Sequence, residues 1–136
     1  MPLALKNHTK APINMIGALC QVAYTYTFAA EPSGTRVELE ELPAGAELHD
    51  IEIVNDALGA GVTLAIGELY SSAADGTTSA NSLKAATAAS SAGVINGGFH
   101  PKLLNTKRTP TITTGGATAT GKISVLVQYT FIGNGQ

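Results

Sequence analysis

The sequence contains no tryptophan and a single cysteine, Cys20, among its 136 residues. One thiol excludes an internal disulfide framework, and it also excludes a zinc site built from several thiolates. The missing tryptophan removes a hallmark of true immunoglobulin domains. Cys20 alternates with Val22, Tyr24 and Tyr26, so we expect it to be a small apolar residue of a strand.

Charged residues and long hydrophobic runs are also scarce. Charged residues make up 13% of the chain, whereas about a quarter is typical. The net charge of −2 gives no overall attraction to nucleic acid or to an anionic membrane, so neither is expected as a partner. The run APINMIGALC (11–20) is far shorter than the roughly 20 apolar residues of a spanning helix, and Leu19 stands where a lipoprotein signal requires a small residue. We expect a protein made and kept in a cytoplasm.

Alternation with a period of two residues dominates the rest of the chain. It predicts strands at 20–29, 35–41, 46–54, 62–69 and 122–131, separated by turns rich in glycine and proline. Short strands without a long helical pattern predict an all-β, antiparallel two-sheet sandwich. We expect a jelly-roll-like fold over one domain, 19–136, preceded by an extended N-terminal arm, 1–18.

Two segments break this rhythm. Residues 71–93 are small and polar, which predicts a long loop in which Ser79 or Asn81 caps a short helix over 83–89. The segment 93–100 predicts another strand, broken by Asn-Gly-Gly. The sequence TPTITTGGATATGKISVLVQYTFI (109–132) predicts a closing hairpin.

The stretch RVELEELPAGAELHDIEI (36–53), called the acidic stretch below, holds six of the ten carboxylates and His49. Carboxylates two residues apart on one strand face could hold a hard cation or flank a glycosidic bond. They are also the ordinary outward face of an amphipathic strand, which we favour. His49 is expected on the same face as Ile51 and Ile53, as a half-buried strand residue.

No motif predicts catalysis, a metal or a cofactor. The chain has neither a paired-histidine metal motif nor a G-x-S-x-G nucleophile elbow, and Gly59-Ala60-Gly61 lacks the third glycine of a dinucleotide fingerprint. We therefore expect a protein that is not an enzyme and needs no cofactor.

Charge is unevenly distributed along the chain. All ten acidic residues lie between Glu31 and Asp75, a span in which Arg36 is the single Lys or Arg. That span therefore has a charge of −9, and the other seven cations lie outside it. Folding could mix these charges in space. Alternatively, an acidic and a basic patch favour self-association or docking on a partner, with Lys102, Lys107 and Arg108 as the basic contact candidates.

The arm, 1–18, shows no clean alternation and contains Pro2 and Pro12. It is either a frayed terminus or an arm that orders on a neighbouring subunit. Its interface candidates are the apolar residues Leu3, Leu5, Ile13, Met15 and Ile16.

A family resemblance adds to this interpretation. LPAGAELHDIEIVNDALGAGVTLAIGEL (42–69) and TPTITTGGATATGKISVLVQYTF (109–131) contain L-P-x-G-A, D-x-L-G, T-L-x-I-G and T-T-G-G-A-x-A-T-G. Over residues 42–131 the chain thus resembles the capsid decoration or cement proteins of tailed phages, which are of jelly-roll type. The motifs are mostly turns, so they indicate the fold more strongly than the function.

The resemblance implies a non-enzymatic virion protein on the outer surface of an icosahedral head. It would bridge neighbouring major capsid subunits, as a homo-oligomer with a dimer favoured, and many weak contacts would stabilise the shell together. The alternatives are a carbohydrate-binding or fibre-associated jelly-roll module and a small hydrolase. For a sugar-binding module, Tyr70 is the aromatic not assigned to a core face.

Overall fold

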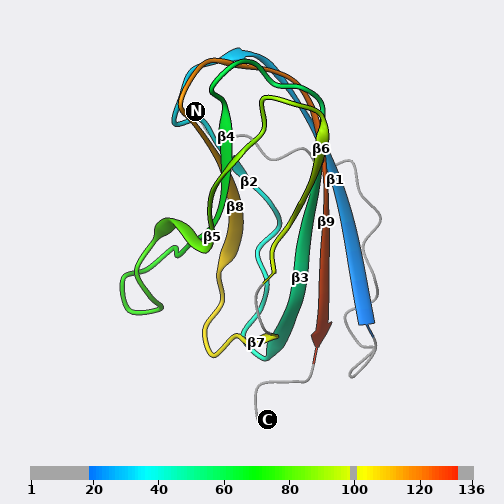
Figure 1. Cartoon of the computed structure of the whole chain (residues 1–136). Coiled ribbons are helices and arrows are strands. Elements are labelled where there is room, and N and C mark those ends of the chain that lie inside the picture. The colour runs from blue at the N-terminus through cyan, green and yellow to red at the C-terminus, as the bar shows by residue number, and fades with distance from the viewer. Residues whose placement is uncertain (1–18, 99–100, 132–136) are drawn as a thin grey trace.

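The computed structural model describes residues 19–98 and 101–131, which form two antiparallel sheets packed face to face (Figure 1). Nine strands build these sheets: β1 (Leu19–Glu31), β2 (Arg36–Glu38), β3 (Ala46–Asn55), β4 (Thr63–Leu69), β5 (Ser79–Ala88), β6 (Gly93–Asn96), β7 (Lys102–Leu103), β8 (Thr109–Gly115) and β9 (Ala119–Phe131). The predicted arm, 1–18, lies outside the described residues. No helix long and apolar enough to cross a membrane occurs in the described ranges.

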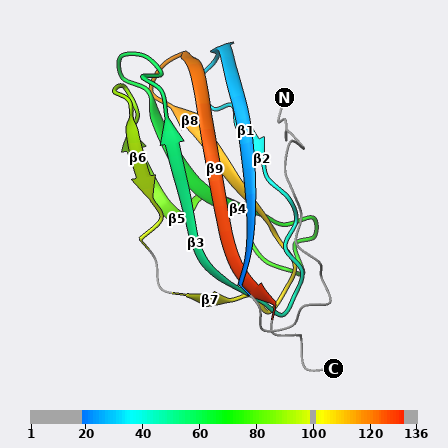
Figure 2. The same cartoon turned by 90° about the vertical axis from the view of Figure 1, so that its right-hand side faces the viewer.

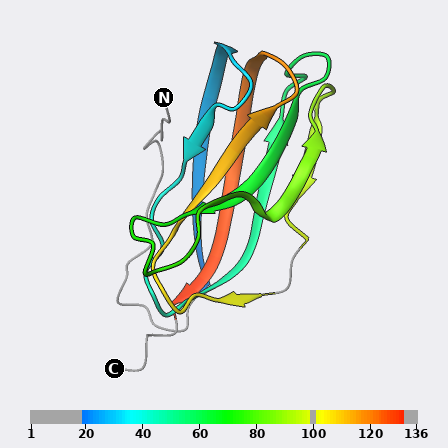
Figure 3. The same cartoon turned by 90° about the vertical axis from the view of Figure 1, so that its left-hand side faces the viewer.

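The order of the strands is that of a jelly roll. One sheet, called the β1 sheet, has the order β1-β9-β3-β6, with β7 also paired to β3, and faces the viewer in Figure 2. The other, called the β4 sheet, has the order β2-β8-β4-β5 and faces the viewer in Figure 3. Apart from the β4–β5 pair, strands that follow one another in sequence do not pair, which is the interleaved topology of a jelly roll. The predicted all-β, jelly-roll-like sandwich is confirmed.

Alternating side chains from both sheets form one core. In β1, Val22, Tyr24, Tyr26 and Phe28 are buried, and in β9 Ile123, Val125, Val127 and Tyr129 are buried. The two strands pair along most of their length, with Val22 opposite Val127. The period-two pattern therefore predicted the inward faces of the two longest strands correctly, because each strand has one face on the core and one on solvent.

The predicted closing hairpin is wrong. β8 pairs with β2 and β4, whereas β9 pairs with β1 and β3, so the segment after β8 crosses from one sheet to the other. Gly116 has φ +82°, and a Cβ atom there would collide with the carbonyl group of Gly61. The Gly-Gly pair at 115–116 thus allows two backbones to approach closely at the crossing. Because a Gly-Gly pair is also typical of a tight turn, the sequence predicted a hairpin here.

The predicted helix over 83–89 is also wrong, because β5 occupies Ser79–Ala88 and pairs with β4. A Cβ atom on Gly67 would overlap the carbonyl oxygen of Ser79, so the missing side chain lets β5 lie close against β4. Small residues here fit an edge strand, and pairing overrides local helix propensity. The predicted strand within 93–100 is confirmed as β6.

Candidate interaction surface

The acidic stretch is divided between the two sheets. β2 belongs to the β4 sheet and β3 to the β1 sheet, with residues 39–45 crossing between them. Arg36 in β2 donates a hydrogen bond of 2.9 Å from Nη2 to Oε2 of Glu38. Within the described part of the chain, no group of three or more His, Cys, Asp or Glu side chains is arranged to hold a metal ion. The carboxylates of the stretch therefore do not form one centre.

His49 lies on the opposite face from the one predicted. The register of β3 against β9 shifts between Leu48 and Asp50, and this β-bulge reverses the alternation, so that Leu48 and Ile51 are both buried. His49 then points outward, where Nε2 lies 2.8 Å from Oγ1 of Thr130 and 3.6 Å from Oε1 of Glu47. A bulge leaves little trace in a sequence, which is why simple alternation assigned the wrong face.

A buried ion-pair network, not anticipated from the sequence, lies at one end of the core. Glu68 in β4 is 3% exposed and Arg108 is 7% exposed. Oε2 of Glu68 accepts hydrogen bonds from Nη1 of Arg108 at 3.0 Å and from Nζ of Lys102 at 3.1 Å, and Oε1 accepts one from Oγ of Ser82 at 2.9 Å. The carboxylate thereby ties β4, β5, β7 and the segment before β8 together.

The electrostatics of this network follow from its contacts. Burial by itself would raise the pKa of the Glu68 carboxyl, but the hydrogen bonds from Arg108, Lys102 and Ser82 outweigh it and leave the pKa below its ordinary value. The signal for Glu68 was present in TLAIGEL, since Leu64, Ile66 and Glu68 share the inward face. A charge at an inward position predicts a buried partner.

Lys102 and Arg108 thus both pair with Glu68 of the same chain, Arg108 as a buried group and Lys102 as a partly exposed one. The guanidinium of Arg108 also lies over the ring of Tyr70, 4.9 Å from its centroid, as a cation–π contact. This contact covers one face of Tyr70. The assignment of Lys102 and Arg108 as contacts for a partner stays a prediction, as does that of Lys107.

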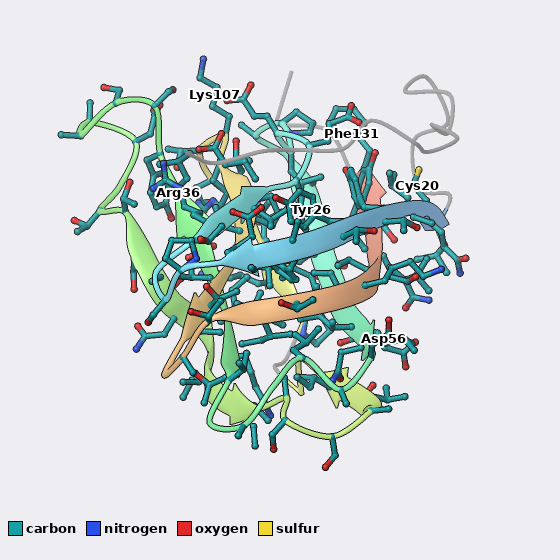
Figure 4. The ribbon with its side chains drawn as sticks, turned by 90° about the horizontal axis from the view of Figure 1, so that it is seen from above. Cys20, Tyr26, Arg36, Asp56, Lys107 and Phe131 are labelled. Carbon is teal, nitrogen blue, oxygen red and sulfur yellow. The ribbon has the colours of Figure 1, made fainter. Side chains whose placement is uncertain are left out.

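An apolar cavity of about 630 Å³, called the edge groove below, opens between the two sheets. Inward side chains of β1 and β9 form its floor, and the segments 40–44 and 105–107 form its walls. It is lined by Cys20, Val22, Tyr24, Glu40, Glu41, Leu42, Pro43, Ala44, Asp75, Asn105, Thr106, Lys107, Val127, Tyr129 and Phe131. Figure 4 shows Cys20 and Phe131 at the start of β1 and the end of β9, and Lys107 on the same side of the molecule.

The groove lies past the end of β2. β2 ends at Glu38, and the chain then stays beside the segment before β8 through backbone hydrogen bonds between Leu42 and Arg108, so that residues 40–44 form one wall of the groove. The Tyr24 hydroxyl accepts a hydrogen bond of 3.0 Å from the backbone N–H of Glu40, which holds one wall against the floor. Burial raises the pKa of Tyr24 far above its ordinary value, and the nearby Glu40 carboxylate adds to this rise.

Comparisons with known proteins find chains of similar fold but no significant similarity of sequence. No protein-family model matches the chain, and a search of curated proteins finds no significant match. Among solved structures, a chain in the capsid of Ralstonia phage GP4 is similar, with 17% identity and a TM-score of 0.69, covering 96% of this chain and 97% of that one. A chain in the capsid asymmetric unit of cyanophage Pam1 has 20% identity and a TM-score of 0.56, covering 93% and 94%.

Proposed function

We propose that the protein is a structural virion component that decorates and stabilises an icosahedral phage capsid by bridging major capsid subunits. The observation that carries the proposal is the similarity of fold, over nearly the whole of both chains, to chains of two phage capsid structures. Because identity is low, this similarity concerns the fold, and function must be argued from the surface.

The surface is compatible with this role. The described residues present an edge groove and several exposed apolar side chains, including Val54, Val94 and Leu103 along β3, β6 and β7. Apolar side chains on a thinly charged surface suit docking on another protein. We further propose that the major capsid protein is the partner, that the protein forms a homo-oligomer with a dimer favoured, and that it is made in the host cytoplasm and lies on the outer capsid surface.

Co-sedimentation with purified phage heads tests this proposal. The intact protein should pellet with the heads at a saturating ratio, and removal of residues 1–18 should weaken binding if the predicted arm residues contact a neighbouring subunit. Heads carrying the protein should also survive heating or chelation that ruptures bare heads. If neither form pellets with heads, the decoration role is wrong.

A second candidate, a carbohydrate-binding or fibre-associated module, is favoured by the chemistry of the edge groove. Tyr24, Tyr129 and Phe131 supply aromatic surface there, with the carboxylates of Glu40 and Glu41 beside it. Aromatic rings with a few polar groups are typical of small-ligand sites. A glycan array separates the two functions, because the decoration role predicts capsid binding without glycan retention.

A further inference from the structure

The edge groove lies where residues 1–18 join the described chain. Leu19 is the first residue of β1, and the next residue, Cys20, already lines the groove. The described chain therefore begins beside the floor of this cavity. Eighteen residues reach at most about 60 Å when fully extended, which exceeds the dimensions of a cavity of about 630 Å³ many times over.

The chemistry of the two parts is complementary. The groove is lined mainly by apolar and aromatic side chains, among them Val22, Leu42 and Val127. Residues 1–18 contain the five apolar interface candidates named above, three of which fall within 13–16. Burial of such side chains in a preformed apolar cavity is favourable in proportion to the area removed from water.

The charges of the groove and of residues 1–18 are also complementary. Three carboxylates, those of Glu40, Glu41 and Asp75, line the groove, and Lys107 is the cation among its described lining residues. Residues 1–18 contain Lys6 and Lys10 and no acid. A basic segment beside an acidic rim is favoured electrostatically.

We propose that the edge groove is the docking site of residues 1–18 of the same chain. Covalent attachment beside the groove gives this segment a high effective concentration, so it should outcompete the same segment of a second copy in dilute solution. The sequence has a glycine, Gly17, two residues before the start of β1, and glycine tolerates the backbone conformations of a reversal of direction. This inference concerns the isolated protein and does not rest on the proposed function.

The thiol of Cys20 reports on the groove, since it is the single cysteine of the chain and lines the cavity. Removal of residues 1–18 should speed the reaction of this thiol with a maleimide by about tenfold or more. In the intact protein the docked segment must dissociate from the groove before the reagent can reach the thiol. A peptide of residues 1–18 added to the truncated protein should slow the reaction again. Equal rates for intact and truncated proteins, both folded by circular dichroism, would overturn the proposal.

A point variant covers the case in which truncation unfolds the protein. The double substitution Ile13→Asp and Met15→Asp should speed the reaction of Cys20, because it places charge in an apolar cavity. The matched control, Asn7→Asp with Asn14→Asp, adds the same charge beside the acidic rim but removes no apolar side chain, so it should speed the reaction much less than the apolar variant does. If the control and the apolar variant behave alike, the segment is not held by its apolar side chains and the proposal fails.

Carbodiimide cross-linking identifies the occupant directly. In an equal mixture of ¹⁴N- and ¹⁵N-labelled protein, amide links from Lys6 or Lys10 to Glu40, Glu41 or Asp75 should join peptides of one isotope. Peptide pairs of mixed isotope would assign the groove to the segment of a second copy and overturn the proposal. Absence of any such link in folded protein would also overturn it.

Discussion

Glu68 is a buried charged residue on the inward face of β4, and its hydrogen-bond partners explain why the core tolerates it. Arg108, Lys102 and Ser82 satisfy the carboxylate, and Arg108 in turn donates from Nε to the carbonyl oxygen of Thr106 at 3.2 Å. A buried pair of this kind does not necessarily stabilise a fold more than apolar residues would, but loss of one partner strands the other in a poorly solvated site.

The substitution Glu68→Gln should therefore destabilise the protein by about 3 kcal/mol, since it leaves Arg108 buried without a countercharge. Urea denaturation measures the change in the free energy of unfolding. Glu52→Gln, on the outward face of β3, is the matched control and should change stability by less than about 0.5 kcal/mol. Equal effects of the two substitutions would contradict an energetic role for the network.

The same residue predicts a dependence of stability on pH. The pKa of Glu68 is lower in the folded protein than its ordinary value, so its ionised form stabilises the fold above that ordinary value, and the stabilisation is lost as the pH falls below it. The difference in unfolding free energy between the intact protein and Glu68→Gln should shrink as the pH is lowered from about 6 to about 3. A difference that stays constant over this range would refute the assignment.

At the scale of elements, close approach of backbones explains two of the wrong predictions, the helix over 83–89 and the closing hairpin. Gly67 admits β5 beside β4, and Gly116 admits the crossing from β8 to β9 beside Gly61. In both cases the glycine acts on a segment distant in sequence. Local patterns treat such glycines as turns or weak strand residues, so they do not predict the partner.

Gly67→Ala should destabilise the protein by about 1–3 kcal/mol, because the added methyl group meets the backbone of Ser79 and Ala80 rather than a movable side chain. Hydrogen exchange should show the largest loss of protection in β5. Gly93→Ala is the matched control, since a Cβ atom at Gly93 has no neighbour within 4 Å. Thermal unfolding that ranks the control as the more damaging change would show that β5 does not pack as described.

At the scale of the whole molecule, the sandwich leaves different chemistry at its two open edges. The groove lies between the inward faces of β1 and β9 and the segment 40–44, whereas Val54 and Val94 stand directly opposite each other on the outward side of β3 and β6, 48% and 56% exposed. Exposed cross-strand valines add apolar area without supporting the core. They are therefore a candidate contact in the proposed capsid role.

Replacing this pair by an opposite-charge pair, Val54→Lys with Val94→Glu, should weaken co-sedimentation with phage heads by about tenfold if the pair is a contact hot spot. Opposite charges facing each other across strands preserve pairing, so folding should be retained. Gln21→Glu with Ala23→Lys is the control: it adds one charge of each sign to the outward face of β1, two residues apart on one strand, and should bind heads as the intact protein does. Full binding by the valine variant would exclude this edge as the contact.

The sequence by itself determined which residues face the core in β1 and β9 and that the chain forms a two-sheet sandwich, because alternation is a local property of a strand with one wet face. Tertiary structure decided which strands pair, the outward turn of His49 at the bulge, the strand at Ser79–Ala88, and the union of Glu68 with Arg108. It also decided the edge groove, because only folding brings the inward side chains of β1 and β9 together with the segments 40–44 and 105–107. Contacts between segments far apart in sequence create each of these features, and the pattern of one segment does not identify the segment that it contacts.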